Sequence, residues 1–461
     1  MFLKESIVMP NYLSPGVYVE EVASGSAPIT GVGTSTAGFI GIIPSSQPSA
    51  PQQPANSQLE AKRIGENLES TSSQLPVGEV ATSTDQSISD TSPSTRTKPA
   101  RSSSQSTTAT LTSISGELEK TTQNILIPPN EVKLCTNFSE FEKFFGSLSS
   151  SDTQKPKTET PHLAHAVNGF FRNGGTRCYV VQVKDESDIE KEALEKFEAL
   201  DEIAIVAAPG WSDKRNIIIA EHCKKMANRF AILDCQEKAE HTAISSDTTA
   251  SKSDYAALYF PWIEVFDPAT KEKIFVPPSG HIAGIYARVD TQRGVHKAPA
   301  NEVLVGAVGL KHNISKSQQD GLNPKGINCI RNLNGNIRVW GARTIGGDAN
   351  GEFKYINVRR LFNYLKKSID QGTQWTVFEP NSPELWAKIR RNVTSFLMTV
   401  WRSGALFGNT PEQAFYVKCD EETNPPELRE QGQVITEIGV AIVKPAEFVI
   451  FHLSQWSEPG K

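Results

Sequence analysis

The chain has 461 residues, a formal net charge of -5 at pH 7 and a hydrophobic fraction of 38%. This length and composition predict a folded protein of about three domains. The weak negative charge gives no support for nucleic-acid binding through a basic field, and no run approaches the roughly 20 apolar residues that span a bilayer. Because the first residues lack the basic-then-apolar pattern of a signal peptide, we expect assembly in the cytoplasm, with no direct membrane insertion.

The first predicted element is a strand near the N-terminus, preceded by the turn signal Pro15-Gly16. Apolar and polar residues alternate along it with one single-residue slip, as in a half-buried strand. Its residues are Val17, Tyr18, Val19, Glu20, Glu21 and Val22. A strand this close to a terminus either docks on its own domain or donates its backbone hydrogen bonds to the sheet edge of another chain.

A short buried strand over residues 38–43 follows and ends at Pro44. From Ser45 to Gln123 the composition then shifts to Ser, Thr, Gln, Pro and Ala, with no aromatic residue between Phe39 and Phe138. Such a segment cannot bury enough apolar surface to offset the entropy of ordering it. We therefore expect residues 45–123 to be a mostly disordered insertion.

The central part of the chain alternates between helical and strand-like patterns. Amphipathic helices are predicted at 138–146 and 162–171, and strands at 178–183, 203–207 and 229–234. Strands that alternate with helices in this way favour an α/β domain. Six cysteines without CxxC spacing are predicted to be reduced, buried thiols, namely Cys135, Cys178, Cys223, Cys235, Cys329 and Cys419.

The last third is rich in aromatic residues and apolar periodicity. A helix is predicted from Val358 to Ile369, followed by a strand at 375–378, and two further strands are predicted at 434–443 and 447–451. Between them, Ser382 and Pro383 give a helix start signal for residues 383–403.

The 383–403 helix carries one apolar stripe, and Lys388, Arg391 and Arg402 project from the opposite side. Two readings of this basic side remain open. It is either a solvated face of an ordinary amphipathic helix or a face that docks on an acidic partner.

The motifs of enzyme and cofactor sites are absent or incomplete in the sequence. The glycines at 31–38 lack the GxGxxG spacing, and Gly321 to Gly326 have P-loop spacing, but Ile327 replaces the required lysine. His162 and His165 share a helix without a third ligand nearby, and His281 and His296 are isolated. The sequence therefore assigns no catalytic residue, no metal and no cofactor.

From Asp254 onward the sequence resembles the tail sheath proteins of contractile phage tails and contractile injection systems. The segments that carry this resemblance are 255–262 (YAALYFPW), 277–288 (PPSGHIAGIYAR), 293–302 (RGVHKAPANE), 321–328 (GLNPKGIN), 337–344 (IRVWGART), 354–361 (KYINVRRL), 375–381 (WTVFEPN), 401–405 (WRSGA) and 440–451. Residues 14–22, 38–41 and 163–181 are similar to the opening elements of the same family. Only the 45–123 segment lies outside the resemblance.

The resemblance implies a mixed α/β (α+β) multidomain sheath subunit that stacks as six-subunit rings into a helical sleeve around an inner tube. Contraction of the sleeve drives the tube through a target envelope, without nucleotide hydrolysis in the subunit. The implied partners are other copies of the chain, the inner tube protein, and baseplate and terminal cap proteins. Within the family, an N-terminal arm and a C-terminal strand from neighbours join a sheet of the C-terminal domain, and a helix equivalent to 383–403 faces the tube.

Mapped onto this sequence, the linker strands are Val17 to Val22 and the C-terminal run Phe448, Val449, Ile450 and Phe451, and the tube-facing residues are Lys388, Arg391 and Arg402. The predicted domains are a linker arm (1–23), a first core strand (24–44), the insertion (45–123), a central α/β domain (124–320) and a C-terminal domain (321–461). Two alternatives remain: an inner-tube or baseplate component of the same machine, and an α/β enzyme in the central region.

Overall fold

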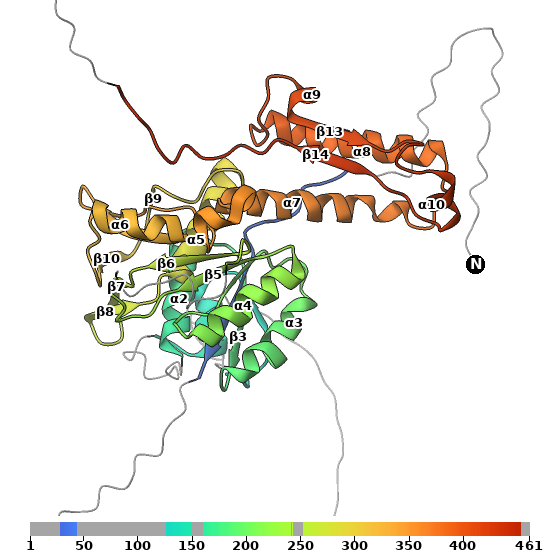
Figure 1. Cartoon of the computed structure of the whole chain (residues 1–461). Coiled ribbons are helices and arrows are strands. Elements are labelled where there is room, and N and C mark those ends of the chain that lie inside the picture. Colours follow the sequence, from blue (N-terminus) through green and yellow to red (C-terminus); the bar gives the residue numbers. More distant parts are fainter. Residues whose placement is uncertain (1–27, 44–125, 149–159, 241, 243–251, 453–461) are drawn as a thin grey trace, which may run out of the picture. The chain divides into compact units, whose positions relative to one another are not determined.

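The structure is a computed structural model, and it describes residues 28–43, 126–148, 160–240, 242 and 252–452 (Figure 1). The chain divides into one unit of residues 1–45 and 124–461 and another of residues 46–123, and all described residues belong to the first. The predicted linker arm and the predicted insertion therefore lie outside the described residues.

A nine-stranded sheet forms the body of the first unit, in the order β2-β3-β1-β4-β5-β6-β11-β12-β9. Its six central strands, from β3 to β11, are parallel, and β2, β12 and β9 are antiparallel additions at the two sides. The strands are β1 (Ala37–Ile42), β2 (Lys133–Cys135), β3 (Cys178–Val183), β4 (Ile205–Ala207), β5 (Phe230–Asp234), β6 (Ala256–Phe260), β9 (Glu302–Val303), β11 (Ile327–Leu333) and β12 (Asn336–Val339).

The central strands are apolar on both sides because helices cover both faces of the sheet. Successive residues enter different cores: Phe39 packs with one cluster and Ile40 with the other, and Ile232 and Leu233 divide in the same way. The first core contains residues of α1 (Phe138–Phe145), α2 (Pro161–Arg172) and α5 (Ser279–Arg293). The second contains residues of η1 (Ile189–Leu194), α3 (Glu195–Glu198), α4 (Asp213–Met226) and α6 (Lys316–Leu322).

Helices α2 and α5 approach each other closely because glycines line their contact. A Cβ added at Gly280 would lie 2.3 Å from the Cα of Ala166, and one at Gly284 would lie 2.4 Å from the carbonyl oxygen of Phe170. Helix α5 is buried around most of its surface, so it acts as a core element of the body.

A smaller antiparallel sheet lies beside the body, with β7 (Ile263–Asp267) between β8 (Glu272–Val276) and β10 (Ala307–Leu310). The short 3-10 turn η2 (Asn323–Lys325) precedes β11, and η3 (Gly347–Phe353) leads from β12 to the C-terminal elements.

The C-terminal elements have a core of their own. Helices α7 (Ile356–Thr373) and α8 (Pro383–Arg402) pack with a two-stranded sheet of β13 (Phe415–Lys418) and β14 (Glu437–Val440) (Figure 1). The short helices α9 (Pro411–Ala414) and α10 (Pro426–Glu430) complete this region. The predicted mixed α/β fold, the helix at 383–403 and its seven-residue apolar stripe are confirmed.

Three strand predictions in the last third are wrong or too long. Residues 375–378 contain a 3-10 turn, η4 (Gln374–Thr376), because the chain reverses there between α7 and α8. The strand predicted at 434–443 is limited to β14, because its partner β13 has only four residues. Residues 447–451 form no strand within the chain, since no edge of the described part pairs with them.

Candidate functional site

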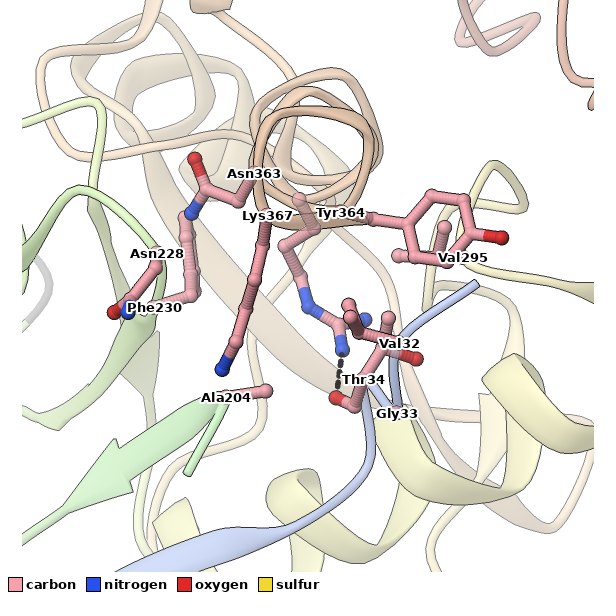
Figure 2. A pocket seen from close by; sticks show the side chains of 11 residues that line it. Val32, Gly33, Thr34, Ala204, Asn228, Phe230, Val295, Asn363, Tyr364 and Lys367 are labelled. Carbon is pink, nitrogen blue, oxygen red and sulfur yellow. Dashed lines mark hydrogen bonds between the residues drawn. The ribbon is translucent and has the colours of Figure 1, made fainter. Parts of the chain in front are cut away.

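Residues 28–34, which we call the N-terminal segment, run along α7. Near the start of the helix, Arg360 Nη2 donates a 3.0 Å hydrogen bond to the carbonyl oxygen of Thr34 (Figure 2). Near its end, a Cβ added at Gly372 would lie 2.6 Å from Ile29. The described part of the N-terminal segment therefore begins beside the C-terminal end of α7.

A buried ion pair fixes this N-terminal segment. Arg360 donates to both carboxylate oxygens of Asp290, at 2.8 and 2.6 Å, and Thr34 Oγ1 donates to the same carboxylate at 2.6 Å. Both charged side chains are 4% exposed. Burial disfavours the charged guanidinium, but Asp290 more than offsets this effect, so the pKa of Arg360 is raised. Removal of either partner would leave a buried charge uncompensated, at a cost of about 3–5 kcal/mol.

A cavity of about 20 Å³ lies between the N-terminal segment, the sheet body and α7. Thr34, Asn363 and Lys367 line it (Figure 2). This volume suits about one water molecule and is far below the few hundred Å³ of a small-molecule site. The cavity is therefore too small for a cofactor.

A hollow of about 240 Å³ lies at the carboxyl ends of β1 and β4, where open α/β sheets bind ligands. Arg215 in its wall already pairs with Glu186 at 3.1 Å and donates to the carbonyl oxygen of Pro209. His162 also lines it, and burial lowers its pKa. The described residues around this hollow offer neither a nucleophile paired with a base nor a set of metal ligands.

His165, His281 and the six cysteines are buried. Burial lowers the pKa of His281 to about 3, so this imidazole is neutral, and an added Cβ at Gly169 would lie 2.3 Å from its Nδ1. His165 lies 3.6 Å from Asp267 within the body. All six cysteines are buried, as predicted. Among the described residues, no group of three or more His, Cys, Asp or Glu could hold a metal ion.

The C-terminal segment leaves from the opposite end of α7. The Tyr355 hydroxyl, just before α7 begins, donates a 2.8 Å hydrogen bond to Glu447. The next four residues expose large apolar side chains, at 70% for Phe448, 68% for Val449, 76% for Ile450 and 88% for Phe451. We call the points beside α7 that are marked by Ile29 and Glu447 the two chain exits. Since α7 has 18 residues, these exits are about 27 Å apart along the helix axis.

The sheet of β13 and β14 keeps open edges. No third strand joins it among the described residues, although residues near Leu406 extend its pairing through a bridge to Ile442. Phe415 packs in the core with α8, whereas Tyr416 is 59% exposed and lies over Gly439 on the other face. Open edges of this kind present unpaired backbone groups to another strand.

One side of α8 carries three exposed cations. Lys388, Arg391 and Arg402 are all exposed, and they lie opposite the buried apolar stripe. Glu384 precedes them near the start of the helix. The structure brings these three cations onto one helix face, whereas Val17 to Val22 lie outside the described residues.

The sequence patterns missed the two ion pairs that fix the chain exits, Arg360–Asp290 and Arg343–Glu447. Their partners are 70 and 104 residues apart, and charged residues are ordinarily exposed. A charged residue within an apolar helical pattern, such as Arg360 next to Leu361, is the sequence signal that could have predicted a buried partner for Arg360.

Comparison with known proteins agrees with this architecture. The family model of the phage tail sheath protein central domain matches residues 187–345, and that of the phage tail sheath C-terminal domain matches residues 348–455. Together they cover more than half of the chain. The chain belongs to the phage tail sheath family.

Several curated tail sheath proteins are similar to the chain. That of Burkholderia phage BcepMu is 27% identical over 216 residues, which are 45% of this chain and 44% of the relative. That of Vibrio phage KVP40 is 27% identical over 209 residues, 44% of this chain and 30% of the relative. The chain thus spans less than half the length of these two relatives. A putative prophage major tail sheath protein of Pseudomonas aeruginosa (strain UCBPP-PA14) is 24% identical over 311 residues, 65% of this chain and 75% of the relative.

Solved structures share the fold over most of the chain. The anti-feeding prophage helical sheath in its contracted state has a TM-score of 0.64 and 25% identity, covering 96% of this chain and 99% of that chain. The sheath complex of the extracellular contractile injection system PVC, also contracted, has a TM-score of 0.66 and 23% identity, covering 97% and 98%. The described part of the chain contains no helix that is both long and apolar enough to cross a membrane.

Proposed function

We propose that the chain is the structural subunit of a contractile sheath. Copies polymerise as stacked six-subunit rings around an inner tube, and contraction of this sleeve drives the tube through a target envelope. The subunit stores conformational energy in the assembly and hydrolyses no nucleotide. The machine is assembled in the bacterial cytoplasm and belongs to a phage tail or a tail-like injection particle.

The observation that carries this proposal is the placement of donor and acceptor segments on one subunit. The N-terminal and C-terminal segments leave at opposite ends of α7, and the sheet of β13 and β14 has open edges. A subunit that donates strands at one site and accepts them at another makes head-to-tail contacts, which generate rings or helical polymers.

The proposed donors are Val17 to Val22 and Phe448 to Phe451, and the proposed acceptor is the β13 and β14 sheet. Backbone ladders between subunits would stay paired while the arms that lead to them rotate, so the subunits could slide without dissociating. Similar solved structures support this reading, because they include a helical sheath in a contracted state and a six-fold symmetrised baseplate of the anti-feeding prophage.

The proposed partners are further copies of the chain, the inner tube protein, and baseplate and terminal cap proteins. The exposed stripe with Lys388, Arg391 and Arg402 is the proposed tube-facing surface, because these three cations are exposed on one helix face and can pair with acidic groups. Repetition along the polymer would add many weak pairs into a strong contact.

Electron microscopy of the purified chain tests this function. Hollow tubes or cogwheel-like rings are the expected particles, and co-purified tube protein should lie inside them. Discrete single particles that bind a small molecule saturably would contradict the sheath and support an enzyme of the central region. Narrow tubes formed by the chain alone would instead support an inner-tube component.

A further inference from the structure

The C-terminal segment is held at one residue, Glu447, by a complete set of hydrogen bonds. Arg343 donates to it through two parallel bonds, Nε to Oε1 at 2.7 Å and Nη2 to Oε2 at 2.8 Å. Asn323 Nδ2 donates to Oε1 and the Tyr355 hydroxyl to Oε2, both at 2.8 Å. Each carboxylate oxygen therefore accepts two bonds, in the fork geometry that gives arginine pairs their directional specificity.

The guanidinium that binds Glu447 is itself fixed. Arg343 is 3% exposed, and its Nη1 donates to the carbonyl oxygen of Asn323 and to Asp348, both at 3.1 Å. Arg343 and Tyr355 also form a backbone bridge. The groups that hold Glu447 thus come from η2, the bridge and the start of α7, all of which are ordered parts of the subunit.

The C-terminal segment is hydrogen-bonded to the rest of the subunit shortly before Glu447 but not directly after it. The Val443 amide donates to the carbonyl oxygen of Ala405 at 3.2 Å, and Pro445 restricts the backbone between the two attachments. From Phe448 to His452 the chain makes no backbone hydrogen bond with another described residue, and the apolar side chains of Phe448 to Phe451 are exposed. The boundary between fixed and free chain therefore falls between Glu447 and Phe448.

We propose that Glu447 is the positioning residue of the C-terminal arm and that Arg343 is its receptor. The pair sets the point and the direction in which residues 448–452 leave the subunit, so that the arm reaches a second copy of the chain in one orientation. Flexing during sliding is then confined to residues after 447. This inference rests on the proposed function, because it presumes that the arm is donated to a neighbour.

Pulsed electron paramagnetic resonance on the full-length chain tests the proposal. Spin labels at Lys366→Cys on α7 and His452→Cys on the arm report one distance distribution, and the six native cysteines are buried and do not compete for label. In unassembled subunits we expect the distribution to broaden about twofold or more in Glu447→Gln. Arg343→Lys should broaden it similarly, because a lysine keeps the charge but cannot form the two parallel bonds.

Asp348→Asn is the matched control. It removes a carboxylate from the same guanidinium, but Asp348 is largely exposed and does not touch the arm, so the distribution should stay narrow. A lowered melting temperature without broadening in Glu447→Gln would show a merely structural role and would overturn the proposal. Equal broadening in Asp348→Asn would also overturn it, since the effect would not depend on the arm's own contact.

A second variant separates this proposal from the function on which it rests. Phe448→Ser with Phe451→Ser should abolish sheath formation while leaving Glu447 in place. If this variant forms normal sheaths, the C-terminal arm is not a donor and the proposed function fails for this segment. If it blocks sheaths but Glu447→Gln leaves the distance distribution unchanged, the arm is a donor and only the positioning role fails.

Discussion

The sheet body and the C-terminal region use their backbone and apolar groups differently. In the body, β4, β5 and β6 are entirely buried, and helices cover both faces of the sheet. In the C-terminal region, β13 and β14 are only half-buried, no third described strand joins their sheet, and Tyr416 and Phe407 are exposed. The central strands of the body are therefore buried within one chain, whereas the C-terminal sheet exposes groups that, under our proposal, other chains contact.

The two regions meet through a polar interface along α7. Arg359 pairs with Asp254 and Arg360 with Asp290, while the apolar side of the helix faces the C-terminal core. The C-terminal core is a cluster separate from the two body cores. Substitutions can therefore test folding in one region and assembly in the other.

The largest expected effect is a loss of folding stability at the crossing of α2 and α5. In Gly280→Ala, the new Cβ would meet the backbone of Ala166 at 2.3 Å, and we expect the free energy of unfolding to fall by about 3 kcal/mol or more. Gly439→Ala in the C-terminal sheet meets only the Tyr416 ring, which is exposed and can rotate, so its loss should stay near 1 kcal/mol. Urea unfolding measures both, and equal losses would erase the distinction between the regions.

The next effect is a loss of assembly without a loss of stability. Phe448→Ser with Phe451→Ser changes only exposed side chains, so the free energy of unfolding should change by less than about 0.5 kcal/mol. Sedimentation should nevertheless show no polymer. Val400→Ala in the C-terminal core is the counterpart, since Val400 is 5% exposed and its truncation should lower stability by roughly 1–3 kcal/mol. Polymer formation by the serine variant would show that the C-terminal arm is not required for assembly.

A more selective effect is expected from the exposed stripe of α8. Lys388→Glu with Arg391→Glu should form sheaths of normal diameter but retain little inner tube, as measured by the ratio of tube to sheath protein in pelleted particles. Each exposed pair contributes at most about 1 kcal/mol and is screened by salt, so the difference between the variant and the native chain should be largest at low ionic strength. Lys366→Glu on α7 is the control and should leave the ratio of tube to sheath protein unchanged. An unchanged ratio in the α8 variant would show that this stripe is an ordinary solvated helix face.

The smallest effect is a pH dependence of the C-terminal arm. Burial alone would raise the pKa of Glu447, but hydrogen bonds from Arg343, Asn323 and Tyr355 outweigh it and lower the pKa. A carboxylate with a lowered pKa stabilises the folded state above its unfolded pKa of about 4.3, and this contribution is lost as pH falls through the lower folded value. The spin-label distribution of the native chain should therefore stay narrow at pH 5 and broaden only in stronger acid. Broadening already between pH 7 and pH 5 would contradict this.

Much of the fold could be predicted from the sequence where local periodicity decides the structure. The apolar stripe of α8, from Leu385 to Val400, and the alternating strands and helices of the body follow from short-range patterns. The strand predicted at 375–378 failed because the turn before α8 depends on contacts such as that of Asn381 with Gln433. The pairs Arg360–Asp290 and Arg343–Glu447 join segments 70 and 104 residues apart, so no local pattern could identify the partner of either arginine. The open edges of β13 and β14 likewise depend on strand pairing and became visible only in the structure.

Deletion of residues 1–22 tests the central claim most directly. The account predicts a folded chain with an unchanged free energy of unfolding that forms no sheath by itself, because it can accept a neighbour's arm but cannot donate its own. Mixed with the full-length chain, the truncated chain should shorten sheaths in proportion to its amount, as seen by electron microscopy. Sheaths of normal length from the truncated chain alone would contradict the account.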